Sequence, residues 1–351
     1  MKTTNEIKLG AILSYVILGL ELIIGLVYTP ILTKMLGQAE YGLYSLVASV
    51  ISYLTVLDLG FGSAIVIYTA RYRANKDTDK EHKLHGMFFI IYLIIGVIAG
   101  ILGCILYLNL DKMFGNSMSI QEIKTAKTMM LILIGNLVIT FPMSIFSSII
   151  TAYEKFVFAK SLNIVRIIIS PLITIPLLLL GYKSIAVVTV TTILNIITLV
   201  INMFYCLNKL KVKLDFTKFN FKLLIEIFSF SFFIFLNVIV DKVNWSLDQF
   251  ILGAVSGTIA VAIYNIAAQI NTIYLSFSTA ISGVLLPRIT QMETNKATNQ
   301  DFTEFFIKVG RIQYIIMGLI ITGFVLVGKE FMIIWQGEEY LQSYYIACVL
   351  M

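Results

Sequence analysis

Long apolar runs follow one another along almost the whole sequence, and they constrain its fold more than any other feature. A helix needs about 20 consecutive apolar residues to cross a bilayer, and nine runs of that order alternate with polar breaks. Of the 351 residues, 58% are hydrophobic and 13% are charged, whereas about a quarter are charged in a soluble domain. The sequence therefore excludes a cytosolic enzyme and a disordered or fibrous chain, and it predicts an all-α polytopic membrane protein.

The predicted spans are helical, because the alternating segments of about 10 residues that mark a membrane β-barrel do not occur. The first run is too long for a secretory signal peptide and lacks a small-residue cleavage site, so we expect it to remain as a span. A tenth run, from Tyr344 to Met351, is too short to cross a bilayer. The nine predicted spans are Leu9–Thr33, Gly42–Ala70, Met87–Leu110, Thr128–Thr151, Leu162–Gly181, Ser184–Leu207, Leu223–Leu252, Ile259–Leu286 and Ile312–Trp335.

The distribution of basic residues predicts a cytoplasmic N-terminus. Of the 26 Lys and Arg residues, 18 fall in segments that would then face the cytoplasm, 6 fall in segments on the opposite side, and 2 fall within spans. Lys and Arg are enriched in the loops that stay in the cytoplasm. The basic stretch Lys209–Lys222 obeys the same rule, so it is interpreted as a connector and no nucleic-acid partner is expected.

Neither the cysteines nor the histidines indicate a metal site or a disulfide framework. Cys104, Cys206 and Cys348 each lie in an apolar run, and His82 and His85 share one polar loop without ligand partners nearby. The sequence contains no Gly-rich phosphate loop, no HExxH motif and no nucleophile elbow. We therefore expect no catalytic residues, no bound metal and no enzyme activity.

An internal repeat relates the first two spans to the seventh and eighth. When the chain is shifted by 220 residues, Gly37 matches Gly257 and Glu21 matches Asp241. Six spans separate the two copies. An even number of spans preserves direction, as in parallel repeats that are related by an axis along the membrane normal.

The repeat predicts two lobes of six spans each. The N-lobe would comprise residues 1–222, with spans one to six and the cytoplasmic linker that follows them. Residues 223–351 would form an incomplete C-lobe, with spans seven to nine and the start of a tenth. Because Met351 corresponds to about position 130 of the first copy, the second lobe is expected to be truncated, and the complete protein is expected to have at least twelve spans.

Ionisable residues within the spans are the candidates for binding substrate or ions, because charges at membrane depth are costly and usually face a cavity or a partner. Asp241 and Asp248 are seven residues apart, with Asn244 between them, which places all three on one face of a helix. The adjacent Lys242 points about 100° away from Asp241. The candidates are Glu21, Asp58, Arg166, Asp241, Lys242, Asn244 and Asp248.

Each candidate also has a structural interpretation. Arg166 lies about one turn from the cytoplasmic end of its span, so its long side chain could reach the interface. Asp58 begins a glycine-rich stretch, Asp58–Gly62, that is consistent with a helix break and with a structural role as much as a role in binding. Glu21 and Asp241 could stabilise packed helices through hydrogen bonds, although a position in the cavity is the preferred interpretation.

Two motifs near the N-terminus resemble a known family. Leu36–Tyr44 (LGQAEYGLY) and Leu57–Gly62 (LDLGFG) are similar to the first hairpin of bacterial polysaccharide-biosynthesis flippases, which reads as an "LG…YG.Y" turn followed by a "DLG" helix. The segments Tyr264–Gln269 and Leu286–Ile289 look like the eighth span of that family. The resemblance covers the whole chain in topology, and its motifs are specific for the family and not for the substrate.

The resemblance implies a transporter of the superfamily that also includes MATE exporters and the lipid II flippase. Two six-helix lobes would enclose a central cavity lined by the first, second, seventh and eighth helices and would work by alternating access. The implied substrate is an undecaprenyl-diphosphate-linked oligosaccharide, moved across the bacterial cytoplasmic membrane for assembly of O-antigen or another cell-surface polysaccharide. Arg71, Arg73 and Arg288 would meet the diphosphate at the cytoplasmic mouth, since guanidinium groups pair with phosphate oxygens. A polysaccharide polymerase and glycosyltransferases are the expected protein partners.

Two other functions stay open, and the mostly acidic charges of the spans suit the first of them. A cation-coupled multidrug exporter of the same superfamily would use the acids to bind Na⁺ or H⁺, and no other cofactor is expected. Such an exporter should need the ion and no lipid carrier. A membrane polysaccharide polymerase or glycosyltransferase is less favoured, because it would display histidine or paired acids on a large external loop, and the sequence has no such loop.

Overall fold

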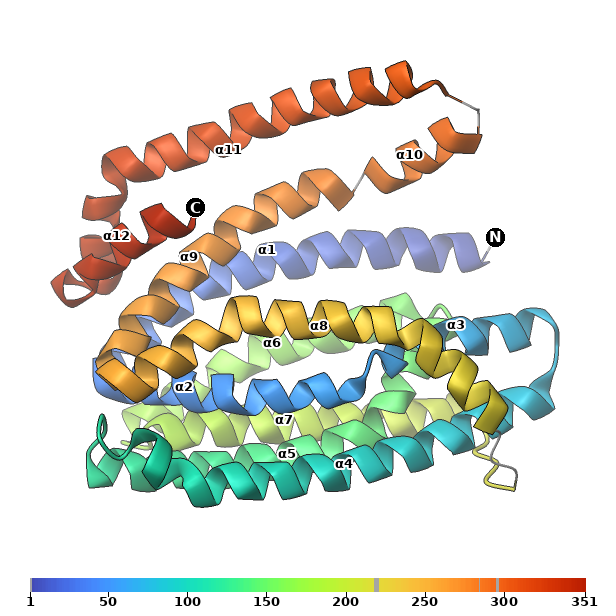
Figure 1. Cartoon of the computed structure of the whole chain (residues 1–351), viewed down its shortest axis with the longest axis horizontal. Helices are drawn as coiled ribbons and strands as arrows, with labels where there is room; N and C mark the ends of the chain where they lie inside the picture. The colour runs from blue at the N-terminus through green and yellow to red at the C-terminus, as the bar shows by residue number, and fades with distance from the viewer. Residues whose placement is uncertain (1, 218–220, 284, 295–296) are drawn as a thin grey trace. The chain divides into compact units, whose positions relative to one another are not determined.

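The computed structural model describes residues 2–217, 221–283, 285–294 and 297–351. In these residues every regular element is helical (Figure 1). The helices are α1 (Lys2–Leu36), α2 (Gln38–Leu54), α3 (Phe61–Ala74), α4 (Thr78–Phe114), α5 (Ile120–Ala152), α6 (Phe156–Leu179), α7 (Ser184–Phe204), α8 (Phe221–Ser256), α9 (Thr258–Gly283), α10 (Leu285–Thr294), α11 (Asn299–Gln336) and α12 (Leu341–Leu350), with short 3₁₀ turns at Thr55–Asp58 and Glu338–Tyr340 and a π turn at Tyr205–Lys209.

The described helices confirm the nine predicted spans. Eight segments are long and apolar enough to cross a membrane. α8 adds a ninth when its parts Leu223–Ser229 and Ser231–Ser256, which meet at 42°, count as one span. α11 starts at Asn299, before the predicted Ile312, because Thr298 caps a polar first turn and begins the helix outside the apolar run.

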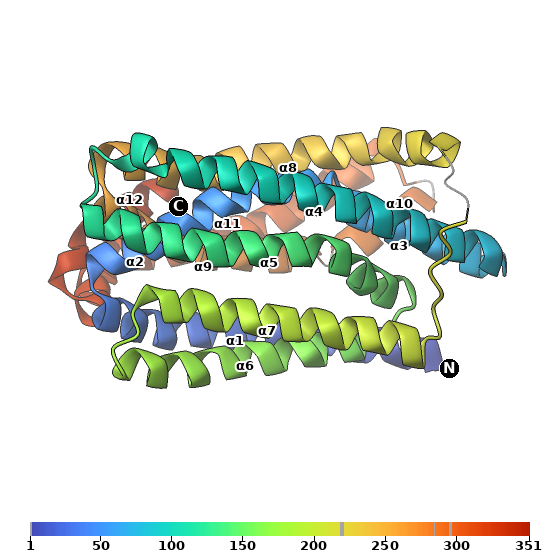
Figure 2. The same cartoon turned by 90° about the horizontal axis from the view of Figure 1, so that it is seen from below.

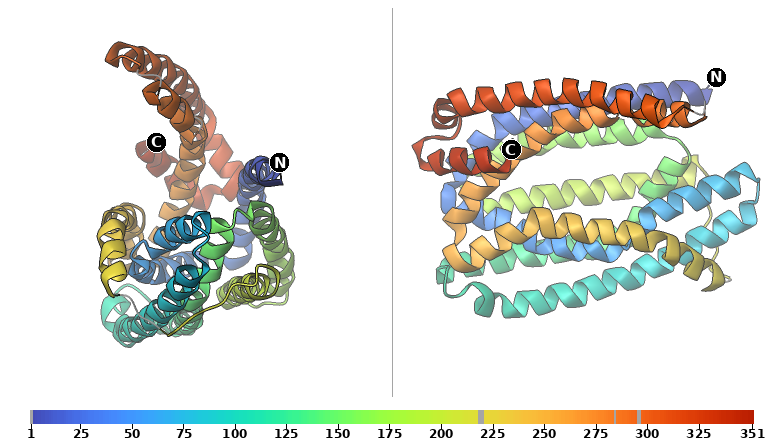
Figure 3. Two further views of the ribbon diagram at one scale, coloured as in Figure 1. Left: turned by 90° about the vertical axis from the view of Figure 1, so that its right-hand side faces the viewer. Right: turned by 45° about the horizontal axis from the view of Figure 1, so that its top comes forward.

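Packing divides the chain into two compact units, Met1–Val261 and Ala262–Met351. In the first unit α4 and α5 pack along their length, and α7 packs against α5 (Figure 2). The side chains of Phe88, Tyr92 and Phe146 are completely buried among these helices, so aromatic contacts form much of the core. In the second unit α12 folds back against α11 (Figure 3).

α8 packs within the first unit, although the repeat assigns it to the second copy. The Ser49 hydroxyl of α2 donates to the Ser246 carbonyl of α8 at 3.0 Å. A Cβ at Gly253 would lie 2.6 Å from a leucine side chain of α2. Small residues allow such close approach of two membrane helices. The compact units therefore reflect the packing of the helices, whereas the predicted lobes 1–222 and 223–351 reflect the repeat. The division into these two lobes stays a prediction.

The second predicted span is broken in the glycine-rich stretch. After the 3₁₀ turn Thr55–Asp58, Leu59 and Gly60 have left-handed φ angles of 54° and 73°, and α3 then begins at Phe61. The helix break is confirmed. Gly60 also faces α8 closely, because a Cβ there would lie 2.8 Å from the Cγ2 atom of Ile234.

Replacing Gly60 with alanine is expected to destabilise the protein strongly. An L-residue in the left-handed region costs roughly 1–2 kcal/mol and overpacking costs about 1–3 kcal/mol, so the expected loss is about 2–5 kcal/mol. Gly37→Ala is the matched control, because Gly37 has a φ of 75° but nothing within 4 Å of an added Cβ. Thermal unfolding in detergent should give the lowest stability for Gly60→Ala. Equal losses in the two variants would show that the contact with Ile234 is unimportant.

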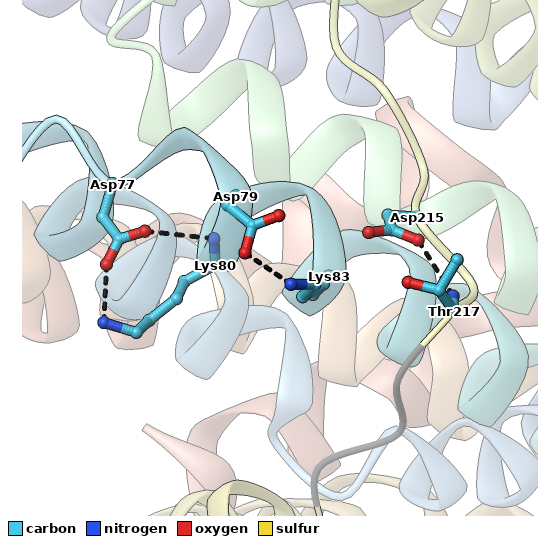
Figure 4. A network of polar contacts seen from close by, with 6 residues as sticks. All are labelled: Asp77, Asp79, Lys80, Lys83, Asp215 and Thr217. Carbon is cyan, nitrogen blue, oxygen red and sulfur yellow. Dashed lines mark hydrogen bonds and ion pairs between the residues drawn. The ribbon is translucent and has the colours of Figure 1, made fainter.

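Exposed acidic and basic side chains organise the start of α4 (Figure 4). The Asp77 carboxylate caps the helix by accepting from the Lys80 backbone N–H at 3.2 Å, and it accepts from the Lys80 ammonium at 2.6 Å. These hydrogen bonds lower the pKa of Asp77. Lys83 pairs with Asp79 one turn apart. Exposed pairs of this kind contribute little to stability, so their main effect is to define where α4 begins.

The segment that follows α7 lies across the start of α4. The Asp215 backbone N–H donates to the His82 carbonyl at 3.1 Å. Hydrogen bonds from the side chain and the backbone N–H of Thr217 lower the pKa of Asp215 (Figure 4). At this crossing a Cβ on Gly86 would lie 2.0 Å from the Asp215 carbonyl oxygen, so only glycine allows the linker to lie against the helix.

Candidate functional site

A pocket of about 320 Å³ lies among α1, α6 and α7. α6 packs against both of the other helices (Figure 2). The α1 residues of the pocket are spaced by three, one and three positions, which places them on one face of the helix. The lining residues are Glu21, Ile24, Gly25 and Tyr28 of α1, Arg166, Ile167, Ser170 and Pro171 of α6, and Thr191 and Leu194 of α7. We refer to this site as the α1/α6/α7 pocket.

Glu21 of α1 and Arg166 of α6 bring opposite charges to this one pocket. Among the described residues no ion pair joins the two side chains. Both side chains are exposed in the absence of lipid. Because an isolated charge at membrane depth is costly, each requires water or a ligand when it is not paired. The geometry therefore favours a pocket position for Arg166 over a purely interfacial one.

Hydroxyl groups supply the remaining polarity of the α1/α6/α7 pocket. The Tyr28 hydroxyl shares a hydrogen bond with the side chain of Thr174, and the Thr174 hydroxyl donates to the Ser170 carbonyl at 2.7 Å. The Thr191 hydroxyl donates to the Val187 carbonyl at 2.9 Å. Each hydroxyl oxygen that donates in this way still has acceptor capacity. Tyr28 and Thr191 line the pocket, so their hydroxyl oxygens can accept hydrogen bonds from a ligand.

Polar residues form a stripe along one face of α8. Asp241, Asn244 and Asp248 are exposed, and Ser246, on the face that packs against α2, is buried. Lys242 is only partly exposed, in agreement with the expected difference in direction from Asp241. Asn237 extends the stripe by one turn, a position that its spacing of four from Asp241 could have indicated. We call these four residues, Asn237, Asp241, Asn244 and Asp248, the α8 stripe.

Asp58 lies in the helix break and is bonded within the protein. The Tyr92 hydroxyl of α4 donates to its Oδ1 atom at 2.7 Å, and the backbone N–H groups of Gly60 and Gly62 donate to the same carboxylate. These donors come from residues that the fold holds in place. The geometry favours a structural role in which Asp58 caps the first turn of α3. The contact with Tyr92, 34 residues away, had no signal in the sequence.

The predicted cytoplasmic-mouth arginines differ in their surroundings. Arg73 lies over the Tyr153 ring at 3.7 Å and donates to the Ala152 carbonyl at 3.0 Å. Arg71 lies over the Tyr68 ring at 5.0 Å, and both arginines are exposed. Arg71 is therefore the more available of these two for an anionic group. The side chain of Arg288 lies outside the described residues.

The structure places the sequence candidates in three different surroundings. Glu21 and Arg166 share the α1/α6/α7 pocket, Asp241 and its neighbours lie on α8, and Asp58 caps the break between α2 and α3. Within the described part of the chain, no group of three or more His, Cys, Asp or Glu side chains is arranged to hold a metal ion.

A polar cluster between α5 and α7 was missed by the sequence analysis. The Asn195 side chain donates to Asn136 Oδ1 and to Thr140 Oγ1, both at 2.9 Å. Asn195 is four residues after Thr191 and so lies on the same side of α7 as the α1/α6/α7 pocket. Asparagine within an apolar run is a weak signal, since such residues also stabilise helix pairs in membranes.

The fold resembles those of solved transporters. A multidrug resistance MATE family transporter of the MOP superfamily aligns in its inward-facing conformation with a TM-score of 0.69 and 14% identity, over 92% of this chain and 74% of that one. An outward-facing conformation of a multidrug resistance MATE family transporter aligns with a TM-score of 0.64 and 15% identity, over 99% of this chain and 77% of that one. A MOP superfamily transporter from Pyrococcus furiosus, described as having a binding pocket of reverse polarity, aligns with a TM-score of 0.62 and 14% identity, over 99% and 77%.

Among curated proteins, none matches this sequence. The sequence profile of the polysaccharide biosynthesis protein family matches residues 8–293, which is most of the chain and includes the α1/α6/α7 pocket and the α8 stripe. Together with the apolar helices and the transporter fold, this match confirms the family that the N-terminal motifs indicated. The chain is a multi-pass membrane protein with a MOP-superfamily transporter fold, and it belongs to the polysaccharide biosynthesis protein family.

Proposed function

We propose that the chain is a flippase that moves an undecaprenyl-diphosphate-linked oligosaccharide across the bacterial cytoplasmic membrane by alternating access. The observation that carries this proposal is the α1/α6/α7 pocket, in which Glu21, Arg166 and several hydroxyl groups meet within membrane-spanning helices of a chain from a polysaccharide biosynthesis family. A polar substrate that crosses the bilayer needs such groups in place of water.

The α8 stripe supports the same proposal from a second helix. Asp241 and Asp248 would be too costly to place against lipid, so we assign this face of α8 to a water-filled substrate cavity. Carboxylates on such a surface can accept hydrogen bonds from sugar hydroxyls. They can also hold a coupling cation, and we propose Na⁺ or H⁺ for that role.

We assign the diphosphate of the substrate to the predicted cytoplasmic mouth. Arg71 is exposed there, and a guanidinium group can bind phosphate oxygens in a bidentate manner. Arg73 would act mainly by positioning the loop that follows α5, because it already donates to the Ala152 carbonyl. The glycosyltransferases and the polymerase of the same polysaccharide are the proposed functional partners.

The proposed function is tested by reconstituting the purified chain into proteoliposomes that contain a radiolabelled undecaprenyl-diphosphate oligosaccharide. Movement of the glycan between leaflets is measured by its accessibility to an external glycosidase, with protein-free liposomes as the control. We expect protein-dependent movement of the lipid-linked glycan. If the glycan stays in its original leaflet although the protein is inserted and folded, the flippase proposal is wrong.

A cation-coupled multidrug exporter is the second candidate, because the acidic α8 stripe would suit an organic cation or its coupling ion. The solved structures with the same fold include multidrug resistance transporters, at identities that establish the fold alone. The same proteoliposomes distinguish the two functions. An exporter should move a fluorescent organic cation when an Na⁺ or H⁺ gradient is imposed, with no lipid-linked glycan present.

A cysteine at position 80 should be labelled by an impermeant maleimide only after the membrane is permeabilised. The reason is the excess of Lys and Arg on the side that includes this position. Lys80 and the matched control Lys124 are both exposed, and the predicted topology places Lys124 outside. Each cysteine is introduced into a variant without the three native cysteines. Labelling of position 80 and protection of position 124 in intact cells would show that the topology is the reverse of the predicted one.

A further inference from the structure

The α1/α6/α7 pocket is formed by three helices of the first compact unit. Among the described residues, every residue that lines the pocket belongs to α1, α6 or α7. The pocket is therefore complete within the first compact unit. Its ligand specificity can be derived from these three helices alone.

The opposite charges of the α1/α6/α7 pocket disfavour a ligand group that is only positively or only negatively charged. An organic cation would be attracted by Glu21 but repelled by Arg166, and a phosphate or carboxylate group would meet the reverse. An uncharged polyhydroxyl group satisfies both residues. Its O–H groups donate to the Glu21 carboxylate, and its oxygen atoms accept from the Arg166 guanidinium. Hydrogen bonds to charged partners are the stronger kind, so both contacts favour such a group.

The size and the apolar surface of the pocket point to a ring of limited size. Small-molecule sites typically enclose about 300–1,000 Å³, and the α1/α6/α7 pocket, at about 320 Å³, lies at the lower end. Ile24, Ile167 and Pro171 line it with apolar side chains next to the polar groups. A pyranose ring presents both kinds of surface, because C–H groups cover its faces and hydroxyl groups surround its edge.

We infer that the α1/α6/α7 pocket binds a single uncharged hexopyranose residue, with its hydroxyl groups donating to Glu21 and accepting from Arg166. The choice of a sugar among polyhydroxyl ligands rests on the proposed function. The pocket is too small for a whole oligosaccharide, so it binds one sugar residue of the glycan. The remainder of the glycan and the diphosphate are left to other surfaces.

Direct binding tests this inference without any transport assay. Saturation-transfer difference NMR on the purified full chain in detergent would use the methyl glycosides of glucose, galactose, mannose and N-acetylglucosamine as neutral probes. Glucuronic acid and glucosamine are the charged probes. We expect at least one neutral glycoside to bind. In Glu21→Gln and in Arg166→Gln its affinity should fall by about tenfold or more, because each variant removes a hydrogen bond to a charged group.

The matched control for pocket binding is Lys34→Gln, which removes an exposed charge near the end of α1, outside the pocket lining. This variant should bind the glycoside as the wild type does. The inference is overturned if none of the four neutral glycosides binds to folded protein, if only the charged sugars bind, or if neither pocket variant weakens binding. If the wild type flips the glycan in proteoliposomes but gives one of these binding results, the inference of a sugar pocket is wrong and the proposed function still stands.

Discussion

Glu21→Gln and Arg166→Gln are each expected to reduce flipping by about tenfold or more. A hydrogen bond to a charged group contributes about 1.5–3 kcal/mol, and each 1.4 kcal/mol corresponds to a factor of ten. Each single variant also leaves the α1/α6/α7 pocket with an unbalanced charge at membrane depth. The measurement is the initial rate of glycan movement in proteoliposomes, normalised to the amount of folded protein inserted.

The double variant Glu21→Gln/Arg166→Gln distinguishes the effect of lost substrate contacts from the effect of an unbalanced charge. Removing both charges restores neutrality, so we expect the double variant to be at least as stable as either single variant. Its flipping rate should nevertheless stay low, because both contacts to the substrate are lost. Lys34→Gln is the matched control and should flip at the wild-type rate. Wild-type flipping by both single variants, with normal insertion, would show that the pocket takes no part in transport.

Gly86→Ala is expected to displace the linker from α4 and to lower the free energy of unfolding by about 1–3 kcal/mol, the usual cost of overpacking. The new Cβ would lie 2.0 Å from the Asp215 carbonyl oxygen and 2.5 Å from its carbonyl carbon. Both atoms belong to the backbone, so no side-chain rotation can relieve the clash. The hydrogen bond from Asp215 to the His82 carbonyl should be lost as the linker moves.

Two measurements test the Gly86→Ala prediction. Thermal unfolding in detergent reports the loss of stability, and limited trypsin digestion at Lys211 and Lys213 reports release of the linker. The matched control is Gly135→Ala, since a Cβ at Gly135 within α5 would meet nothing within 4 Å. Replacing a helical glycine by alanine there should stabilise the chain by roughly 0.5–1 kcal/mol. If Gly86→Ala resists trypsin and heat as the wild type does, the linker does not depend on this crossing.

Properties that depend only on residues close to one another in the sequence could be predicted from the sequence. The nine spans follow from apolar runs, because crossing a bilayer is a requirement on composition and length. The break at Leu59 and Gly60 follows from a glycine-rich stretch, because glycine adopts left-handed φ angles at little cost. The common face of Asp241 and Asp248 follows from helical periodicity alone. The family followed from short motifs and was confirmed over residues 8–293.

Only the tertiary structure decided which of the charged residues meet. Glu21 and Arg166 are far apart in sequence, and each could have been read alone as a lining, snorkelling or packing residue. Their common pocket depends on α6 packing against both α1 and α7. The bond from Tyr92 to Asp58 and the contact of Asn195 with Asn136 likewise join separate helices. Hydropathy determines that a helix crosses the membrane, whereas its neighbours and its rotation depend on side-chain packing and hydrogen bonds between helices.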